Sequence, residues 1–383
     1  MKGTSLYGQL YGIGAFLLIA ILSAVLSVTS RSEAAETGGG VLLRNREEII
    51  DDSLSRMTPE EKLGQLMIVG IHGTRVDDEI RARMGQYHFG GVILFDHNLE
   101  TAEQVKSLTK ELQEAKGGWL PLFIAVDEEG GQVARMRQVV EAPPAALELG
   151  KTDRPELAER WAEKTGGRLR ALGFNLNFAP VADLGSFKSR HFSTDPVKAS
   201  RFVQAASRGY INAGISHALK HFPGIGKGKA DTHFDRVVVD ISREEMMAQD
   251  LLPFREAIKA NEERQDAFMV MLTHAVYPQL TGEQPASISH EACRLLRNEL
   301  GFRGLIITDG MEMKAARVAP FRQLGVMALK AGVDIMLVCH EYEYEDEVYL
   351  GLLEALKSGE ITQERVDESV RRVIAAKLWL MGK

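Results

Sequence analysis

The sequence contains little cysteine and no excess of positive charge. Cys293 and Cys339 are the only cysteines among its 383 residues, and both stand among apolar residues without the spacing of a metal site. We therefore expect two buried free thiols. The net charge is -7, and the sequence has no arginine-rich tract. Since a basic surface that attracts nucleic acid is not indicated, we expect no nucleic-acid partner.

Charge is also absent from a long segment near the N-terminus. Residues 11–28 carry no charged side chain, follow Lys2 and precede a polar stretch. Their length lies at the border between the core of a signal peptide and a membrane-spanning helix. Small residues at Ser32 and Ala34 suit a signal peptidase. The segment predicts either a cleaved signal peptide or an uncleaved membrane anchor.

This segment sets the expected division of the chain. We expect a signal peptide or anchor over residues 1–35, a flexible glycine-containing linker over 36–45 and one folded domain over 46–383. In both alternatives the domain is exported. It is expected in the periplasm, or anchored through residues 11–28 to the outer face of the inner membrane.

Apolar runs of strand length recur along the domain and alternate with segments of helical periodicity. The helical segments include 102–115, 156–172, 243–260 and 321–331, and the tail from 343 predicts two amphipathic helices that pack outside the sheet. Such alternation predicts an α/β fold with a parallel sheet, and eight units in about 300 residues favour a closed (β/α)8 barrel of the TIM type. The eight expected strands are 66–71, 91–95, 122–127, 175–181, 218–222, 268–275, 304–309 and 334–339.

Ionisable residues stand at the ends of five of these strands. In a (β/α)8 barrel the reacting groups lie at the carboxyl ends of the strands. One charged residue there is usually a helix cap or part of a loop ion pair, but five at one rim favour a functional site. They are Asp127, Asp183, the pair Lys220 and His221, His274, and Asp309.

Asp309 stands at the end of an apolar strand with Gly310 behind it. A carboxylate nucleophile must be ionised, fixed in position and unshielded on one side, and this position is suited to that role. Aspartate also suits the N-cap of a following helix, which is the alternative interpretation.

A second motif lies in the glycine-containing segment after Phe222. Asp231 stands two residues before His233, where its carboxylate can orient the imidazole and favour proton transfer. An ordinary turn with a solvated histidine is the alternative. A metal site from His221, Asp231 and His233 is conceivable, but the first strand offers only His72 rather than a His-x-His pair. We therefore expect neither a metal nor an organic cofactor.

These motifs together resemble glycoside hydrolase family 3, and within it the single-domain bacterial β-N-acetylglucosaminidases. The similarity runs from about Met57 to the region of Met336. The segment VDEEGGQVAR resembles the family's Asp-x-Glu-Gly-Gly motif, and no second sheet domain is indicated after the barrel.

The resemblance assigns roles to individual residues. Asp309 matches the family's catalytic nucleophile, and Asp231 and His233 match a dyad in which the histidine is the acid/base. The positions that match substrate-binding residues are Asp127, Arg135, Arg190, Lys220 and His221. The chain departs from the pattern at Ile225, where many relatives carry histidine, and at Gly310, where an acidic residue or alanine often stands.

The resemblance implies a retaining exo-β-N-acetylglucosaminidase with a covalent glycosyl-enzyme intermediate. The expected partner is a carbohydrate with a terminal β-linked N-acetylglucosamine, such as a peptidoglycan fragment. Two alternatives stay open: another exo-β-glycosidase of the β-glucosidase type, and an inactive barrel that binds cell-wall glycan. The sequence does not choose between water and phosphate as the acceptor, nor does it identify the leaving group.

Overall fold

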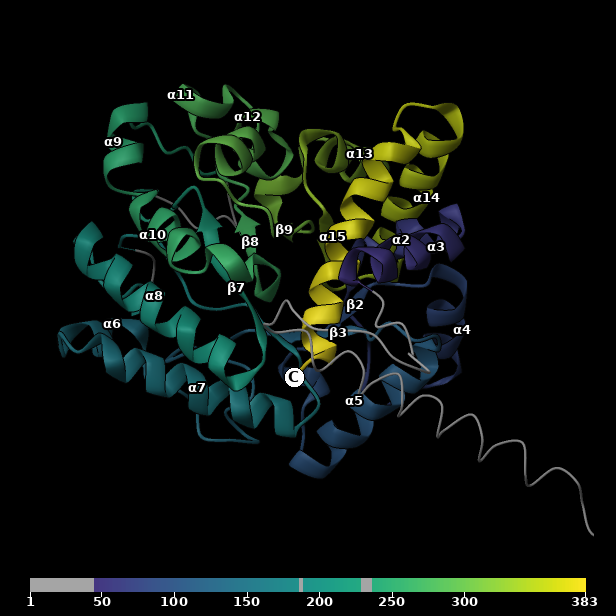
Figure 1. Cartoon of the computed structure of the whole chain (residues 1–383), viewed down its shortest axis with the longest axis horizontal. Helices are drawn as coiled ribbons and strands as arrows, with labels where there is room; N and C mark the ends of the chain where they lie inside the picture. Colours follow the sequence, from purple (N-terminus) through teal and green to yellow (C-terminus); the bar gives the residue numbers. More distant parts are fainter. Residues whose placement is uncertain (1–44, 186–188, 229–235) are drawn as a thin grey trace, which may run out of the picture.

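The fold is a closed barrel of eight parallel strands surrounded by helices (Figure 1), in a computed structural model that describes residues 45–185, 189–228 and 236–383. The expected (β/α)8 architecture is confirmed, and each of the eight expected strands is present, with bounds that differ by a few residues. The barrel strands are β1 (Met67–Val69), β2 (Gly91–Ile93), β3 (Phe123–Val126), β6 (Leu176–Asn177), β7 (Ser216–Phe222), β8 (Phe268–Leu272), β9 (Leu305–Gly310) and β10 (Ile335–Val338).

The ring closes between the first and the last strand. β1 pairs in parallel with β10, with Met67 opposite Met336, and the order around the ring is β1-β10-β9-β8-β7-β6-β3-β2. The strands are apolar along nearly their whole length because side chains fill the barrel on one face and contact the helices on the other.

One element was not expected from the sequence. Directly after β3, the strand β4 (Glu128–Gly130) pairs antiparallel with β5 (Val133–Ala134). The turn between them requires glycine, because Gly130 and Gly131 have φ angles of +104° and +58°. Runs this short carry no periodicity, so the pattern of apolar residues could not indicate this hairpin.

The helices agree with the expected segments, with one exception. The segment 243–260 forms two helices because Pro253, in the first turn of α10, has no N–H to continue α9. The main helices before the tail are α2 (Arg46–Arg56), α3 (Pro59–Gln65), α4 (Asp78–Tyr87), α5 (Ala102–Lys116), α6 (Ala146–Lys151), α7 (Pro155–Ala171), α8 (Pro196–Ala213), α9 (Arg243–Ala248), α10 (Leu252–Ala260), α11 (Pro278–Thr281), α12 (His290–Arg294) and α13 (Phe321–Ala331). The shorter turns include 3-10 helices η1 (Asp96–Asn98) and η6 (Lys314–Ala316).

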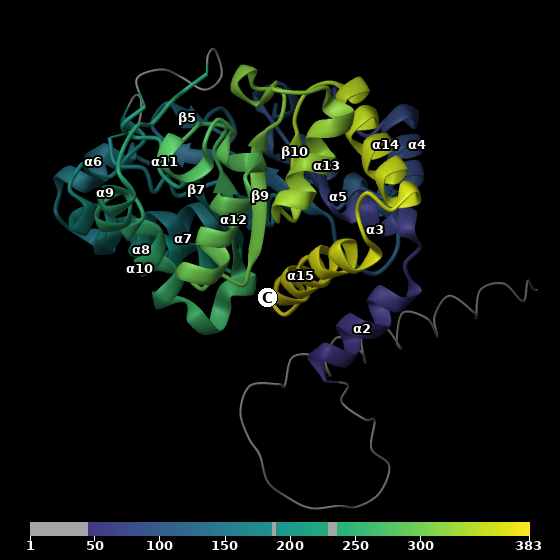
Figure 2. The same cartoon turned by 90° about the horizontal axis from the view of Figure 1, so that it is seen from above.

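The two tail helices lie outside the ring of strands, as expected. They are α14 (Tyr342–Ser358) and α15 (Gln363–Met381), and α15 runs across the amino end of the barrel (Figure 2). Its Ser369 hydroxyl donates to Asp334 at the start of β10 (2.6 Å), and its buried Lys377 donates to Gln65 just before β1 (2.7 Å). Because this end is covered, the carboxyl ends of the strands are left for a site.

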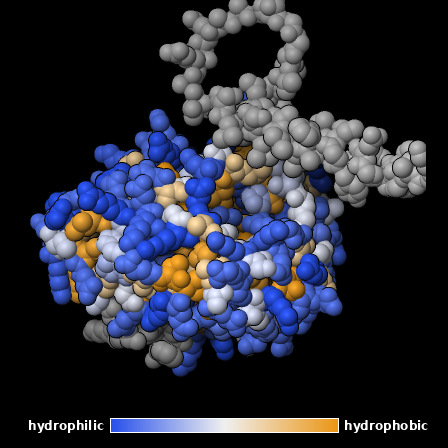
Figure 3. Space-filling view, turned by 90° about the horizontal axis from the view of Figure 1, so that it is seen from below, coloured by the Kyte–Doolittle hydropathy of each residue, from blue (hydrophilic) through white to orange (hydrophobic). Residues whose placement is uncertain are grey.

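The face of the molecule seen in Figure 3 carries apolar patches among mostly hydrophilic residues. Across the described ranges, none of the helices combines the length and the apolar character needed to cross a bilayer. The segment 11–28, for which an anchor or signal is expected, lies outside these ranges.

Candidate active site

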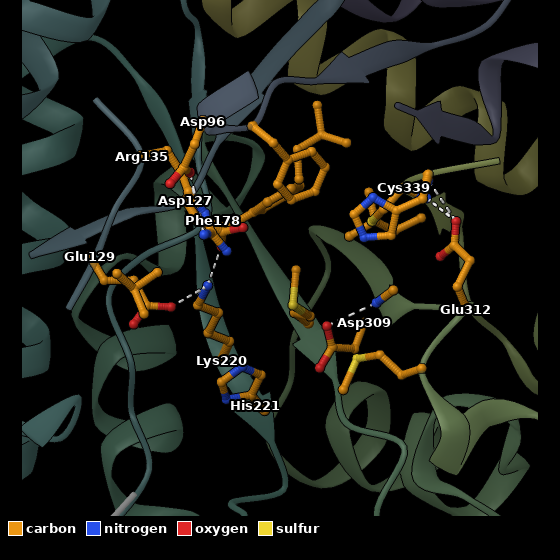
Figure 4. Close-up of a pocket in the computed structure, with 18 of the residues that line it drawn as sticks. Asp96, Asp127, Glu129, Arg135, Phe178, Lys220, His221, Asp309, Glu312 and Cys339 are labelled. Carbon is orange, nitrogen blue, oxygen red and sulfur yellow. Dashed lines mark hydrogen bonds and ion pairs between the residues drawn. The ribbon is translucent and has the colours of Figure 1, made fainter. Parts of the chain in front are cut away.

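A pocket of about 580 Å³ opens at the carboxyl ends of the barrel strands (Figure 4). Its walls come from β2, β4, β5, β7, β8, β9 and β10 and from segments that follow the barrel strands. Six of the eight residues expected in the site line it, namely Asp127, Arg135, Arg190, Lys220, His221 and Asp309. The other two, Asp231 and His233, lie outside the described residues.

Lys220, near the end of β7, is an ammonium held between two carboxylates. Its Nζ lies 2.6 Å from Oδ1 of Asp127 and 2.6 Å from Oε1 of Glu129. Burial by itself lowers the pKa of a lysine, but the two carboxylates outweigh this effect and raise the pKa of Lys220 above its ordinary value. The lysine is therefore charged and fixed in position at neutral pH.

Glu129 joins this lysine to Arg190. The Arg190 guanidinium donates two hydrogen bonds to the Glu129 carboxylate, at 2.8 Å from Nε and 2.7 Å from Nη2. Burial alone raises the pKa of Glu129, yet Lys220 and Arg190 hold it well below the ordinary range. The residue was not selected from the sequence. Its position two residues after Asp127 could have indicated a place in the site, because alternate residues of an extended segment face the same side.

His221 is oriented from behind by Asp183, which does not itself line the pocket. Oδ2 of Asp183 lies 2.8 Å from Nδ1 of His221, and Oδ1 accepts the backbone N–H groups of His221 (3.1 Å) and Ile225 (3.0 Å). Nε2 of His221 lies 3.4 Å from the Arg190 guanidinium. An Nδ1–H donated to Asp183 thus leaves Nε2 directed toward the pocket.

Asp309, in β9, is positioned as an ionised carboxylate. Its Oδ1 accepts the N–H of Gly310 at 2.8 Å. Burial raises its pKa, but the nearby imidazoles of His221 and His274 outweigh burial, and the pKa lies below its ordinary value. The alternative role as an N-cap does not apply, because Asp309 lies within a strand and the next helical turn, η6, begins at Lys314.

His274 supports Asp309 from outside the pocket. Its Nε2 lies 2.9 Å from the carbonyl oxygen of Gly310, and its Nδ1 lies 2.7 Å from the hydroxyl of Ser287. Of the strand-end residues noted in the sequence, Asp183 and His274 therefore hold the others in place, whereas Asp127, Lys220, His221 and Asp309 face the cavity.

Arg135, another basic side chain matched to substrate binding, lines the pocket beside Asp96. Its Nη1 lies 3.3 Å from Oδ1 of Asp96, and its guanidinium lies 5.6 Å from the centre of the Phe95 ring. Within residues 45–185, 189–228 and 236–383, no group of three or more His, Cys, Asp or Glu side chains is placed to hold a metal ion. Cys293 and Cys339 are free, buried thiols, as expected.

Comparison with known proteins agrees with this geometry. The model of the glycosyl hydrolase family 3 N terminal domain matches residues 58–376. The chain belongs to glycosyl hydrolase family 3. The resemblance noted in the sequence is thus confirmed over essentially the whole barrel and its tail helices.

Several relatives of this family 3 chain are named for their activity. A beta-hexosaminidase of Stenotrophomonas maltophilia is 37% identical over 287 residues, which cover 72% of this chain and 83% of that protein. A beta-hexosaminidase of Mycobacterium tuberculosis is 33% identical over 343 residues, which cover 84% of this chain and 83% of the relative.

Solved structures resemble the chain to a similar degree. A glycoside hydrolase family 3 beta-N-acetylglucosaminidase from Paenibacillus sp. superposes with a TM-score of 0.82 at 36% identity, over 85% of this chain. The chain spans 63% of the length of that protein. The M. tuberculosis protein LpqI superposes with a TM-score of 0.78 at 31% identity, over 86% of this chain and 96% of its own.

Proposed function

We propose that this family 3 chain is a retaining exo-β-N-acetylglucosaminidase. It removes a terminal β-linked N-acetylglucosamine from glycans, among them peptidoglycan fragments. The observation that carries the proposal is the ionised Asp309 carboxylate in a pocket whose far side bears the Asp127–Lys220–Glu129–Arg190 network. The names of the relatives support the choice of sugar.

The proposed chemistry is a double displacement. Asp309 attacks the anomeric carbon while the protonated imidazole of His233 donates its proton to the leaving oxygen, which gives a covalent glycosyl-enzyme. Neutral His233 then takes a proton from water, and the water oxygen displaces Asp309 from the same face that the leaving group occupied. The anomeric configuration is retained, and Asp231 orients the imidazole during both steps.

The remaining polar groups orient the sugar. Asp127 and Lys220 offer an acceptor and a donor to ring hydroxyls, and the guanidinium of Arg190 and the imidazole of His221 lie beside them. Because Glu129 and Asp183 hold these groups before substrate arrives, little ordering remains to be done on binding. A further basic group, Arg135, lines the pocket with Asp96 beside it.

The direct test uses aryl glycosides. The folded domain should hydrolyse an aryl N-acetyl-β-glucosaminide faster than the matching β-glucoside, and NMR should show the β-anomer of the sugar as the first product. A preference for the glucoside would favour the β-glucosidase alternative. No turnover of either, with glycan binding intact, would favour a binding barrel. Running the reaction with and without phosphate identifies the acceptor.

We also infer that the domain acts outside the cytoplasm. The uncharged segment 11–28 behind Lys2 supports export, either as a cleaved signal or as an anchor in the inner membrane. In that location the enzyme would meet cell-wall glycan directly.

A further inference from the structure

Glu312 lines the pocket three residues after Asp309, and half of its carboxylate is already engaged. Oε1 accepts the backbone N–H groups of Cys339 and of His340, the latter at 2.9 Å. Oε2 is buried and has no hydrogen-bond partner among the described residues. A buried oxygen without a partner is costly, and such a group in a binding pocket points to a ligand that completes it. The double displacement above does not use it.

The unpaired Oε2 lies close to the backbone of Gly310. A Cβ atom added to Gly310 would lie 3.7 Å from Oε2 of Glu312 and 3.3 Å from Sγ of Cys339. The apolar side chains of Met313 and Leu337 line the pocket beside this oxygen. This part of the pocket wall therefore suits a small group that has both a hydrogen-bond donor and an apolar end.

The location relative to Asp309 identifies the group of the sugar that reaches this part of the pocket wall. In Figure 4, Glu312 and Cys339 lie on the side of Asp309 away from Asp127 and Glu129. When the sugar hydroxyls meet Asp127 and the anomeric carbon meets Asp309, the substituent on the neighbouring carbon C2 extends from beside the nucleophile. An acetamido group at C2 has an N–H donor and a methyl group, whereas a hydroxyl lacks the methyl and is shorter.

We propose that Glu312 is a specificity-determining residue for the 2-acetamido group. Its Oε2 accepts the amide N–H of the sugar, and the methyl group packs against Met313 and Cys339. This inference rests on the proposed function, because it names the group that the same pocket selects. Glu312 thereby distinguishes an N-acetylhexosaminide from a plain hexoside, since a glucoside leaves Oε2 unpaired.

The structure allows a sharp test with Glu312→Gln. Oε1 occupies a position where two backbone N–H groups point at it, so the glutamine must place its carbonyl oxygen there. Its NH2 group then takes the place of Oε2. This group and the amide N–H of the sugar are both donors, so they form no hydrogen bond. Glu312→Ala removes the carboxylate altogether. Glu343→Gln, an exposed glutamate on α14 outside the pocket, is the matched control.

The quantity measured is the ratio of kcat/KM for the 4-methylumbelliferyl N-acetyl-β-glucosaminide to kcat/KM for the corresponding glucoside. The ratio does not depend on the fraction of enzyme that is folded. We expect Glu312→Gln and Glu312→Ala to lower it by about 10- to 100-fold, as for a lost hydrogen bond to a charged group. Glu343→Gln should leave it unchanged.

Two outcomes separate the inference from the function on which it rests. If the wild type prefers the acetamido sugar but both Glu312 variants keep its ratio, the carboxylate only anchors the Cys339–His340 backbone and the inference is overturned. If the wild type shows no preference for the acetamido sugar, the proposed function fails, and this inference fails with it.

Discussion

The carboxylate of Glu129 accepts two hydrogen bonds from the guanidinium of Arg190, at 2.7 and 2.8 Å, and the same carboxylate pairs with Lys220 at 2.6 Å. The side chains of Glu129 and Lys220 are only 4% and 3% exposed, so solvent screens this contact weakly. One carboxylate thus holds two basic groups of the pocket in fixed positions. A ligand meets an arrangement that needs no further ordering.

Glu129→Gln should therefore weaken substrate binding and the fold together. The change leaves two buried cations without a shared anion, so we expect KM to rise by about tenfold or more and stability to fall by about 3 kcal/mol. Kinetics and urea unfolding measure the two effects. Glu141→Gln is a matched control, because Glu141 also joins a lysine and an arginine, Lys164 and Arg168, but at the exposed surface. Equal effects of the two variants would contradict the role given to Glu129.

Asp309→Asn should abolish turnover and leave the fold intact. We expect kcat to fall by more than about 1,000-fold, because the nucleophile is lost while the neutral amide keeps a similar shape. Thermal unfolding checks the fold. A 2-fluoro glycosyl inactivator should label Asp309 in the wild type, and mass spectrometry that finds the label on Asp183 or Glu312 would rule out the assignment.

The pH dependence gives a second check on Asp309. Its ionised form is the active one, so activity is lost as pH falls through its pKa, and that pKa lies below the ordinary value of 3.8. The carboxylate should therefore contribute no acidic limb to kcat/KM above about pH 4. An acidic limb of the kcat/KM profile near neutral pH would contradict this under two conditions. The limb would have to persist in His233→Ala and disappear in an Asp309 variant with residual activity.

His233→Ala should discriminate between leaving groups. A poor leaving group needs protonation, so its release should slow by about 100-fold or more, whereas a good anionic leaving group should be affected little. Asp231→Ala should show a weaker form of the same pattern, since the imidazole remains but loses its orienting partner. Steady-state kinetics on a series of aryl glycosides measures this. Equal losses across the series would mean that His233 binds or packs instead.

Glu128 should make stability depend on pH. It is 1% exposed, its Oε2 accepts the N–H of Met136 at 2.8 Å, and burial raises its pKa to about 7. The native state thus holds this proton more tightly than the unfolded chain. The stabilisation of the fold by this bound proton is complete below about pH 4.5. It is lost as pH rises through 7, and the free energy of unfolding then falls by roughly 3 kcal/mol at most.

Glu128→Gln removes this titration and keeps an oxygen acceptor for Met136. In urea unfolding, the free energy of unfolding of the variant minus that of the wild type should therefore be larger at pH 8 than at pH 5. For Glu103→Gln, at an exposed position on α5, the same difference from wild type should not change between the two pH values. A difference for Glu128→Gln that also does not change with pH would contradict the prediction.

Export can be tested with the full-length chain and a variant that begins at Arg46. Fractionation should place the full-length protein in the periplasm or the inner-membrane fraction and the shortened variant in the cytoplasm. Release of the membrane-bound form by detergent but not by salt would identify an anchor at residues 11–28. Soluble full-length chain in the cytoplasm would reject export.

The sequence by itself determined the barrel and the residues at its rim. Apolar runs and helical periodicity are local properties, and parallel strands bring their carboxyl ends to one face, so Asp127, Lys220, His221 and Asp309 could be placed together before the structure. The family motif added Arg135 and Arg190, and the order of the motifs along the chain is likewise local information.

Only the tertiary structure decided which of these groups face the cavity and which support it. Glu129 contacts Arg190, Asp183 contacts His221, and Oε2 of Glu312 stays unpaired; each depends on residues far apart in sequence or on burial. Even Gly226 is required by packing, since a Cβ there would lie 1.6 Å from the Leu184 carbonyl oxygen. Such contacts follow from how separate segments meet in space, and no pattern within one segment records that.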